Sequence, residues 1–179
     1  ADIWTVMWKE WRELFPRHDG LRGTVLRHVI TVAVFGIVLP LQMGRAWIES
    51  PLSLTFWAWV PLFIVIGVIA DAFAGERERH TLETLLASRL SNRAILFGKV
   101  GAAVGYGWGL VLLSLLLGLV TVNLASGHGE LLLYPATVGL SIVVLSLLAA
   151  GLAAGAGVLV SLRAATVRQA AQTLSIGTM

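Results

Sequence analysis

The residues best suited to chemistry form a charged segment, Asp71–Lys99, between two apolar stretches. Its Glu76, Glu78 and His80 are residue types that bind transition metals, so a metal site is the first possibility to weigh. On a helix Glu76 and His80 would share a face, whereas Glu78 would point away from it. The chain has no cysteine and no HExxH motif, and its other three histidines are scattered. We interpret these side chains as solvated charges, and we predict neither a metal nor a cofactor.

The pair Gly98-Lys99 raises the possibility of a phosphate-binding loop. That motif, GxxxxGK followed by Ser or Thr, requires glycine at position 93 and a hydroxyl residue at position 100. The chain has Arg93 and Val100 there. We therefore predict that the chain does not bind ATP itself, that it is not an enzyme, and that it has no catalytic residues.

Asp71 is an ionisable group at the end of an apolar stretch. Within a membrane such a group is costly and often functional. The alternative is that it lies at the membrane interface and pairs with nearby basic residues such as Arg77, or caps the loop. We favour this alternative, because the apolar stretches offer no acidic partner for a proton relay.

The composition predicts a chain dissolved in lipid. Of its 179 residues, 57% are hydrophobic and 13% are charged, against about 25% charged in a soluble domain. The mean hydropathy is +0.84. The net charge of +3 does not require nucleic acid as a partner, because the basic residues follow the positive-inside pattern. Twelve of the thirteen Lys and Arg fall on one side of the predicted membrane, and Arg45 alone falls on the other.

Residues 1–20 begin with an amphipathic helix. Its apolar stripe includes Trp4, Trp8 and Trp11, and we place Lys9 and Glu10 off this stripe. Tryptophans with a charged opposite face are typical of a helix that lies in the lipid headgroup layer. The alternative is a helix packed on the protein's own membrane spans.

Four apolar stretches are long enough to cross a bilayer, and a fifth begins near the end of the chain. We predict an all-α, polytopic transmembrane helix bundle in the plasma membrane, with a cytoplasmic N-terminus. We also expect the sequence to be part of a longer domain. The predicted spans are residues 24–43, 54–73, 93–122 and 131–162, with a cytoplasmic loop at 74–92.

Glycines recur along the third predicted span, at Gly98, Gly101, Gly105 and Gly109. Small residues at this spacing allow two helices to approach closely. A glycine-lined pathway is the less favoured alternative. In the loop before this span, Thr81 is placed to cap a short helix with an apolar face made by Leu82, Leu85 and Leu86.

The charged segment resembles the signature of ABC-2 type transporter permeases. It reads Asp71-x-Phe-Ala-Gly-Glu-x-Glu-x-x-Thr-Leu-Glu-x-Leu-Leu and continues to Gly98-Lys99. The stretch from Trp8 to Phe15 is similar to the amphipathic elbow helix of these permeases, and residues 161–172 resemble the segment before their fifth span. One departure is His80, where members often have glycine.

The resemblance implies one ABC-2 type transmembrane domain over residues 1–179, with six spans expected in the full-length protein. It implies a permease subunit of an ABC exporter that pairs with a second permease copy, as a homodimer or heterodimer. A separate cytoplasmic ATPase would bind the ATP. The loop between the second and third spans would dock on this ATPase as a coupling helix. Its coupling residues would be Glu76, Glu78, Arg79, Thr81, Leu82, Glu83, Leu85 and Leu86.

Two other functions are weighed against this one. The first is a membrane scaffold or regulatory subunit that binds an ATPase without moving a substrate. The second, an intramembrane enzyme, is disfavoured because the spans contain no paired carboxylates and histidines. The few polar groups in the spans make a hydrophobic or amphipathic cargo a weak preference, and the substrate stays open.

Overall fold

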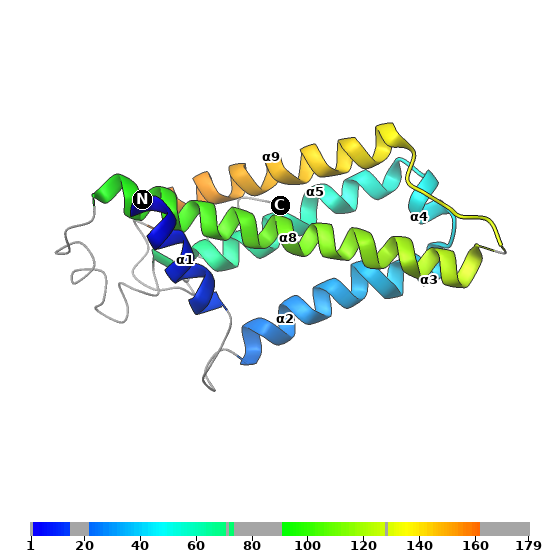
Figure 1. Ribbon diagram of the computed structural model, residues 1–179, viewed down its shortest axis with the longest axis horizontal. Coiled ribbons are helices and arrows are strands. Elements are labelled where there is room, and N and C mark those ends of the chain that lie inside the picture. Colours follow the sequence, from blue (N-terminus) through cyan, green and yellow to red (C-terminus); the bar gives the residue numbers. More distant parts are fainter. Residues whose placement is uncertain (1, 15–21, 71, 74–90, 128, 162–179) are drawn as a thin grey trace. The chain divides into compact units, whose positions relative to one another are not determined.

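The computed structural model describes residues 2–14, 22–70, 72–73, 91–127 and 129–161. Within these residues the secondary structure is helical, and no strand occurs (Figure 1). The helices are α1 (Asp2–Leu14), α2 (Arg22–Ala33), the π-helix η2 (Val34–Val38), α3 (Leu39–Met43), α4 (Ala46–Glu49), α5 (Leu52–Ala70), α8 (Asn92–Ser126) and α9 (Ala136–Ser161).

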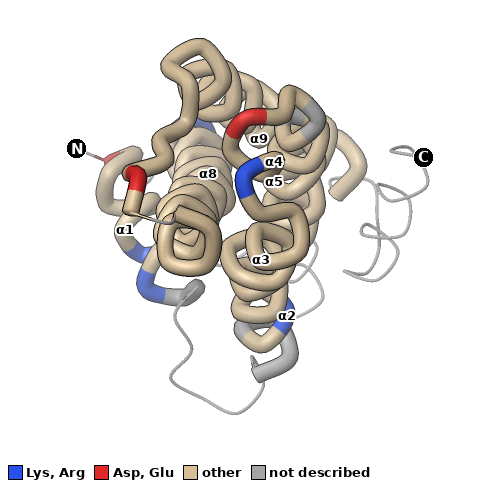
Figure 2. The backbone as a smooth tube through the Cα atoms, turned by 90° about the vertical axis from the view of Figure 1, so that its right-hand side faces the viewer, with Lys and Arg blue, Asp and Glu red and all other residues tan. Residues whose placement is uncertain are grey.

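Three of the helical stretches in the described part are long and apolar enough to cross a membrane: Leu26–Met43, Asn92–Ser126 and Ala136–Ser161. A shorter apolar helix covers Thr55–Ala70. Lys, Arg, Asp and Glu occupy little of the helical backbone (Figure 2). Large apolar side chains are exposed on these helices, including Leu116, Leu140 and Leu152. An all-α, polytopic membrane protein is thus confirmed, whereas four crossings remain a prediction.

Helix α8 begins and ends with polar side-chain contacts. Ser91 caps its start, because the Ser91 hydroxyl accepts a hydrogen bond from the Ala94 backbone N–H at 3.2 Å. The helix ends at Ser126 rather than at the predicted residue 122. In this last turn the Asn123 side-chain amide donates a hydrogen bond to the Leu119 carbonyl oxygen at 2.8 Å.

Helix α9 begins later than predicted. The expected span started at residue 131, but residues 131–135 are not helical and the helix starts at Ala136. Pro135 explains the difference, since proline disfavours a helical conformation of the residue before it and suits a helix start. Asn123 holds the non-helical segment, because its Oδ1 accepts a hydrogen bond from the Leu132 N–H and its Nδ2 donates to the Leu132 carbonyl oxygen, both at 2.8 Å.

The chain divides into two compact units, which are described separately. The first unit takes in residues 1–15, 62–107 and 150–179. Its core packs branched residues of α5, such as Val65 and Ile69, among alanines of α8 and α9. A Cβ added to Gly157 would come within 2.8 Å of Ile69 Cγ2, so α5 and α9 approach at van der Waals distance here.

The second unit comprises residues 16–61 and 108–149. Four aromatic rings cluster in it, with Trp47 stacked on Phe56 at 5.9 Å and edge-on to Trp57 at 5.7 Å between centroids, and Phe35 beside Phe56 and Trp57. The π-helix lies against α8, where the Thr121 hydroxyl donates to the Gly36 carbonyl oxygen at 2.9 Å.

Candidate functional site

The predicted coupling residues, from Glu76 to Leu86, lie outside the described residues, and so does Asp71. The structure describes the two flanks of the charged segment, Phe73 before it and Ser91 after it. Within the described ranges, no three His, Cys, Asp or Glu side chains gather as a metal-binding group. The candidate site therefore consists of described residues near these flanks.

A buried ion pair joins α1 to α8 in the first unit. Lys99 Nζ lies 2.8 Å from Glu10 Oε1, and the Lys99 side chain is fully buried. Glu10 is 8% exposed. Lys9 Nζ approaches the same Oε1 at 3.6 Å from a half-exposed position. Because burial removes both charges from water, the pair must be held in good geometry to compensate for the lost hydration.

Phe73 contacts the same lysine. Lys99 Nζ lies 5.7 Å from the centroid of the Phe73 ring, a cation–π distance, and Phe73 is 6% exposed. We name Glu10, Phe73 and Lys99 the Lys99 cluster. One ammonium group thus connects α1, α8 and the residue that precedes the undescribed segment 74–90.

Helix α1 lies on the glycine face of α8. A Cβ added to Gly98 would come within 2.6 Å of Val6 Cβ and Cγ1, and one added to Gly101 within 3.3 Å of Met7 Sδ. At Gly105 the nearest atom is Trp11 Cζ2, at 3.7 Å. A Cβ at Gly109 would meet nothing within 4 Å. Three of the four glycines therefore face α1, and Gly98 is the closest approach.

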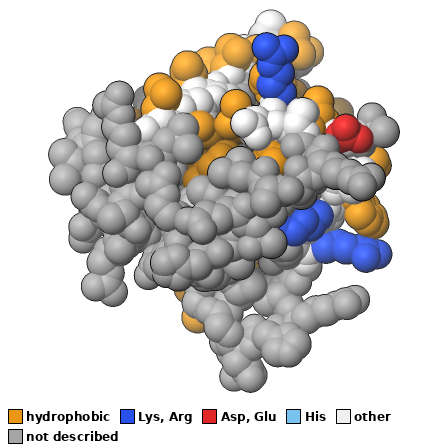
Figure 3. Space-filling model, turned by 90° about the vertical axis from the view of Figure 1, so that its left-hand side faces the viewer, with side chains coloured by type: hydrophobic (Ala, Val, Ile, Leu, Met, Phe, Trp, Pro, Cys, Tyr) orange, Lys and Arg blue, Asp and Glu red, His pale blue; other side chains and the backbone are white. Residues whose placement is uncertain are grey.

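The other face of α1 is open. Trp4 is 65% and Trp8 54% exposed, whereas Val6 is buried. Trp11, which reaches Gly105 of α8, is 38% exposed. Arg12 Cζ lies 5.4 Å from the Trp8 ring centroid. Figure 3 views the left-hand end of Figure 1, where the described atoms include hydrophobic side chains together with Lys and Arg side chains. The helix packs on α8 by one side, as the second interpretation expects, and exposes Trp4 and Trp8 on the other. Its place in the lipid headgroup layer stays a prediction.

The position of Glu10 corrects the sequence analysis. Glu10 was placed off the apolar stripe, but it is buried together with Val6, one helical turn earlier. The reason is a partner distant in sequence, since Lys99 neutralises it. A signal existed in the sequence, because Lys99 is a cation set within an apolar glycine-rich helix, where a carboxylate partner is expected.

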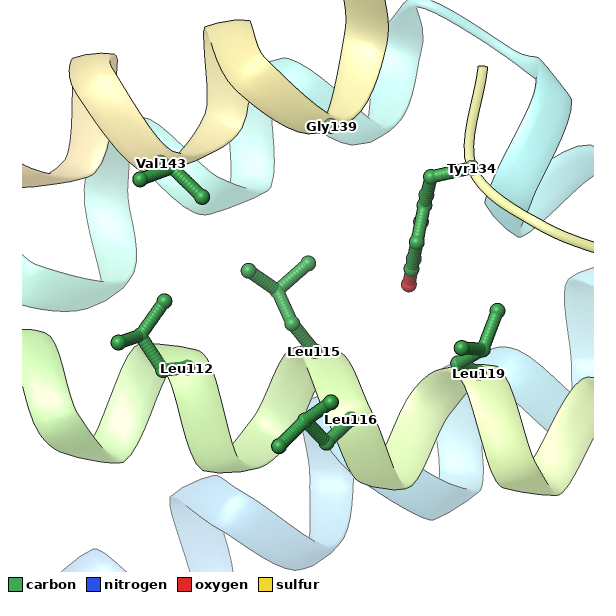
Figure 4. A pocket seen from close by; sticks show the side chains of 7 residues that line it. All are labelled: Leu112, Leu115, Leu116, Leu119, Tyr134, Gly139 and Val143. Carbon is green, nitrogen blue, oxygen red and sulfur yellow. The ribbon is translucent and has the colours of Figure 1, made fainter. Parts of the chain in front are cut away.

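A second candidate site is an apolar groove between α8 and α9 in the second unit (Figure 4). It has a volume of about 340 Å³. We name it the leucine groove. Leucines of α8, Val143 and Gly139 of α9, and Tyr134 from the segment before α9 face it; its lining is Leu112, Leu115, Leu116, Leu119, Tyr134, Gly139 and Val143.

Hydrogen bonds bridge the two sides of the groove near both of its ends. At one end, Trp108 Nε1 on α8 donates to the Val143 carbonyl oxygen on α9 at 3.3 Å. Towards the other end, Asn123 of α8 holds Leu132, two residues before Tyr134. These hydrogen bonds hold α8 and the chain around α9 apart at a fixed distance, so the groove exists without a bound ligand. This groove is not among the sites predicted from the sequence.

Comparison with known protein families gives a match that covers the whole chain. The family model of the ABC-2 type transporter matches residues 1–179. Searches of curated proteins and of solved structures returned no match.

Proposed function

The chain belongs to the ABC-2 type transporter family, and from this premise we propose that it couples to a separate cytoplasmic ATPase through residues 74–92 and forms the pathway of an ABC exporter. The family resemblance stated from the sequence is thereby confirmed. As a member, the chain is a multi-pass membrane permease component of an ABC transporter, which works with an ABC ATPase, commonly as a dimer. The exporter direction, the docking loop and the dimer partner belong to the proposal.

The Lys99 cluster is the observation that supports coupling through this loop. Force applied to residues 74–92 would reach Phe73 directly through the chain. Phe73 contacts Lys99, and Lys99 is paired with Glu10. Because these groups are buried and close-packed, they transmit displacement rather than absorb it. A push on the loop would move α1 and α8 together.

The proposed mechanism follows from this connection. Closure of the ATPase pair on ATP would displace the loop, and Leu82, Leu85 and Leu86 would seat in an apolar groove of the ATPase. Charged neighbours such as Glu83 would form a polar rim around them. The permease would then rock between an inward-facing and an outward-facing state. ATP can drive this change only if it binds the two states with different affinity.

The orientation of the chain is the first part to test. The positive-inside pattern predicts that α1 is cytoplasmic and that the turn after α8 is external. These 179 residues contain no cysteine, so a single cysteine introduced among them is the one thiol of this segment. In intact cells, a membrane-impermeant thiol reagent should label Ala125→Cys and not Asp2→Cys. If Asp2→Cys alone were labelled, the orientation would be the opposite of the predicted one, and coupling to a cytoplasmic ATPase would be excluded.

Disulfide crosslinking tests the coupling itself. Leu85→Cys, in the full-length permease, is co-expressed with its ATPase carrying single cysteines along the presumed docking groove. We expect a crosslink whose yield changes with ATP. Leu124→Cys, exposed at the end of α8, is the control and should not crosslink. If Leu82→Cys, Leu85→Cys and Leu86→Cys all fail to crosslink, the loop does not dock on the ATPase.

A scaffold that binds the ATPase without transport is the alternative function. It would give the same crosslink, so a second measurement is needed. A permease should make ATP turnover depend on cargo and should accumulate that cargo across the membrane. A scaffold would show neither effect.

A further inference from the structure

The leucine groove is a binding site that the proposed function does not use. We propose that it binds one acyl chain of a membrane phospholipid. The inference requires only that the chain is embedded in a bilayer, which its family membership and apolar helices establish. It therefore stands or falls independently of ATPase coupling.

The chemistry of the lining selects an alkyl chain. Among the described residues, the side chains that line the groove are leucines, a valine and Tyr134; none is charged, and the Tyr134 hydroxyl is their one polar group. Water is not a stable occupant, because an ordered water needs two to four polar partners. An apolar cavity of about 150 Å³ already holds benzene, and the groove has about 340 Å³. An acyl chain matches both the size and the chemistry.

The surroundings of the groove identify the bilayer as the source. Leu116 lines the groove and is itself 63% exposed, and the neighbouring Leu140 and Val144 of α9 are 67% and 47% exposed. In a membrane protein such leucines face lipid. The mouth of the groove is thus continuous with the lipid-facing surface, and an acyl chain can enter it sideways from the bilayer.

The ends of the groove fit the depth profile of a leaflet. From Leu112 to Leu119 the lining extends over eight residues of α8, about 10 Å along the helix axis. The Tyr134 end lies beside polar groups typical of an interface: Asn123 with its three hydrogen bonds, and the Arg45–Glu130 ion pair of 2.9 Å in the same unit.

The groove is held open rather than left by loose packing. The Trp108–Val143 and Asn123–Leu132 hydrogen bonds bridge its two sides. Gly139 allows Tyr134 to pack closely against α9, because a Cβ there would come within 3.4 Å of Tyr134 Cβ. If the gap stayed empty, its leucines would lose dispersion contacts on one side. A lipid chain restores them, so its occupancy should exceed that of lipid elsewhere on the surface.

Photolabelling tests the proposal in the intact protein. The full chain is reconstituted in phosphatidylcholine nanodiscs with a trace of phosphatidylcholine that carries a diazirine on one acyl chain. Labelled positions are then mapped by mass spectrometry. We expect at least fivefold more label at Val143 than at Leu148, which is exposed on the same helix but does not line the groove.

Filling the groove provides the decisive comparison. Leu115→Trp places a large ring in it and should reduce the Val143 label at least fivefold, with Leu148 unchanged. The matched control is Leu113→Trp, the same substitution at an exposed position outside the groove, which should change neither label. Leu112→Phe is a milder filling, with an expected reduction of about twofold, for use if Leu115→Trp does not fold.

Two outcomes would overturn the proposal. Equal label at Val143 and Leu148, unaffected by the filling variants, would mean ordinary surface lipid. Absence of label at Val143, together with a disulfide between two copies carrying Leu116→Cys, would mean that a second protein chain covers the groove instead.

Discussion

Lys99 and Glu10 are separated by 89 positions in the chain, yet Lys99 Nζ donates a hydrogen bond of 2.8 Å to Glu10 Oε1 in the interior of the first unit. The pair attaches a short amphipathic helix to a long apolar one by charge rather than by apolar contact alone. Since both side chains are buried, neither can be lost without leaving the other in a poor environment.

The first prediction concerns Lys99→Met, which preserves length and removes the charge. Breaking a buried ion pair typically costs about 3–5 kcal/mol, because the remaining charge is left uncompensated. Lys9 lies 3.6 Å from Glu10 Oε1, so we expect a cost near the lower end, about 3 kcal/mol. Thermal unfolding of the purified protein in detergent measures it.

A double variant separates charge from shape. Glu10→Leu combined with Lys99→Met removes both charges, and it should recover most of the stability lost in Lys99→Met. If the double variant were as unstable as the sum of the two single variants, the pair would not act as a unit.

The second prediction concerns the glycine face of α8. Gly98→Leu places a side chain where Val6 lies, and a Cβ alone would already approach Val6 Cβ to 2.6 Å. We expect α1 to be displaced and the stability to fall by roughly 1–3 kcal/mol, the usual cost of overpacking. Proteolysis of α1 by a protease added outside the micelle measures its release.

Gly109→Leu is the matched control on the same helix. Nothing lies within 4 Å of a Cβ at this position, and leucine is a better helix former than glycine. Protease sensitivity of α1 should be unchanged and stability slightly raised. Equal release of α1 by both variants would show that its attachment does not depend on the approach at Gly98.

These same elements show which parts of the structure the sequence predicts and which it does not. Apolar length alone predicts the helical membrane class, because about 20 apolar residues must find either lipid or a large core. The glycine spacing predicts that a helix packs closely at Gly98, but it does not predict which helix this is. Glu10 was misplaced because local periodicity cannot reveal a partner 89 positions away.

The leucine groove escaped prediction for a related reason. A leucine that faces a neighbour, a lipid or a gap looks the same in sequence, and only the spacing of the two helices distinguishes these cases. That spacing depends on bridges such as Trp108 to Val143. The late start of α9 has a different cause. Pro135 indicates a helix start at Ala136, but the apolar residues 131–134 favour an earlier start in the prediction.

The third prediction concerns Asn123, whose side chain makes three hydrogen bonds to Leu119 and Leu132 backbone groups. Asn123→Ala leaves the Leu132 N–H and carbonyl without these partners, which should cost about 2–3 kcal/mol. The stability of Asn123→Asp should lie between those of the natural protein and Asn123→Ala, because Asp keeps the acceptor oxygen and loses the donor N–H groups. Denaturation in detergent compares them, with exposed Asn92→Ala as the control expected within about 0.5 kcal/mol of the natural protein. Equal stability of all three variants would contradict the role of Asn123.

The fourth prediction concerns the exposed tryptophans of α1. A spin label on Trp4→Cys should report a depth in the headgroup layer, with intermediate collision rates for both oxygen and a water-soluble nickel complex. Trp4 is suited to this test because it is 65% exposed, so that its replacement disturbs little packing. A label fully accessible to nickel would place α1 in water instead.

The π-helix Val34–Val38 has a geometric consequence for everything that precedes it. A π-helical turn contains one residue more than the α-helical register allows. Deleting a single residue there would restore a continuous α-helix and turn Arg22–Ala33 about its own axis by about 100°, one residue of helical rotation. The face that α2 now presents to lipid, including Leu26, Val29 and Ile30, would point elsewhere. One inserted residue, stabilised by the bond from Thr121 to Gly36, thus determines the azimuth of a whole helix.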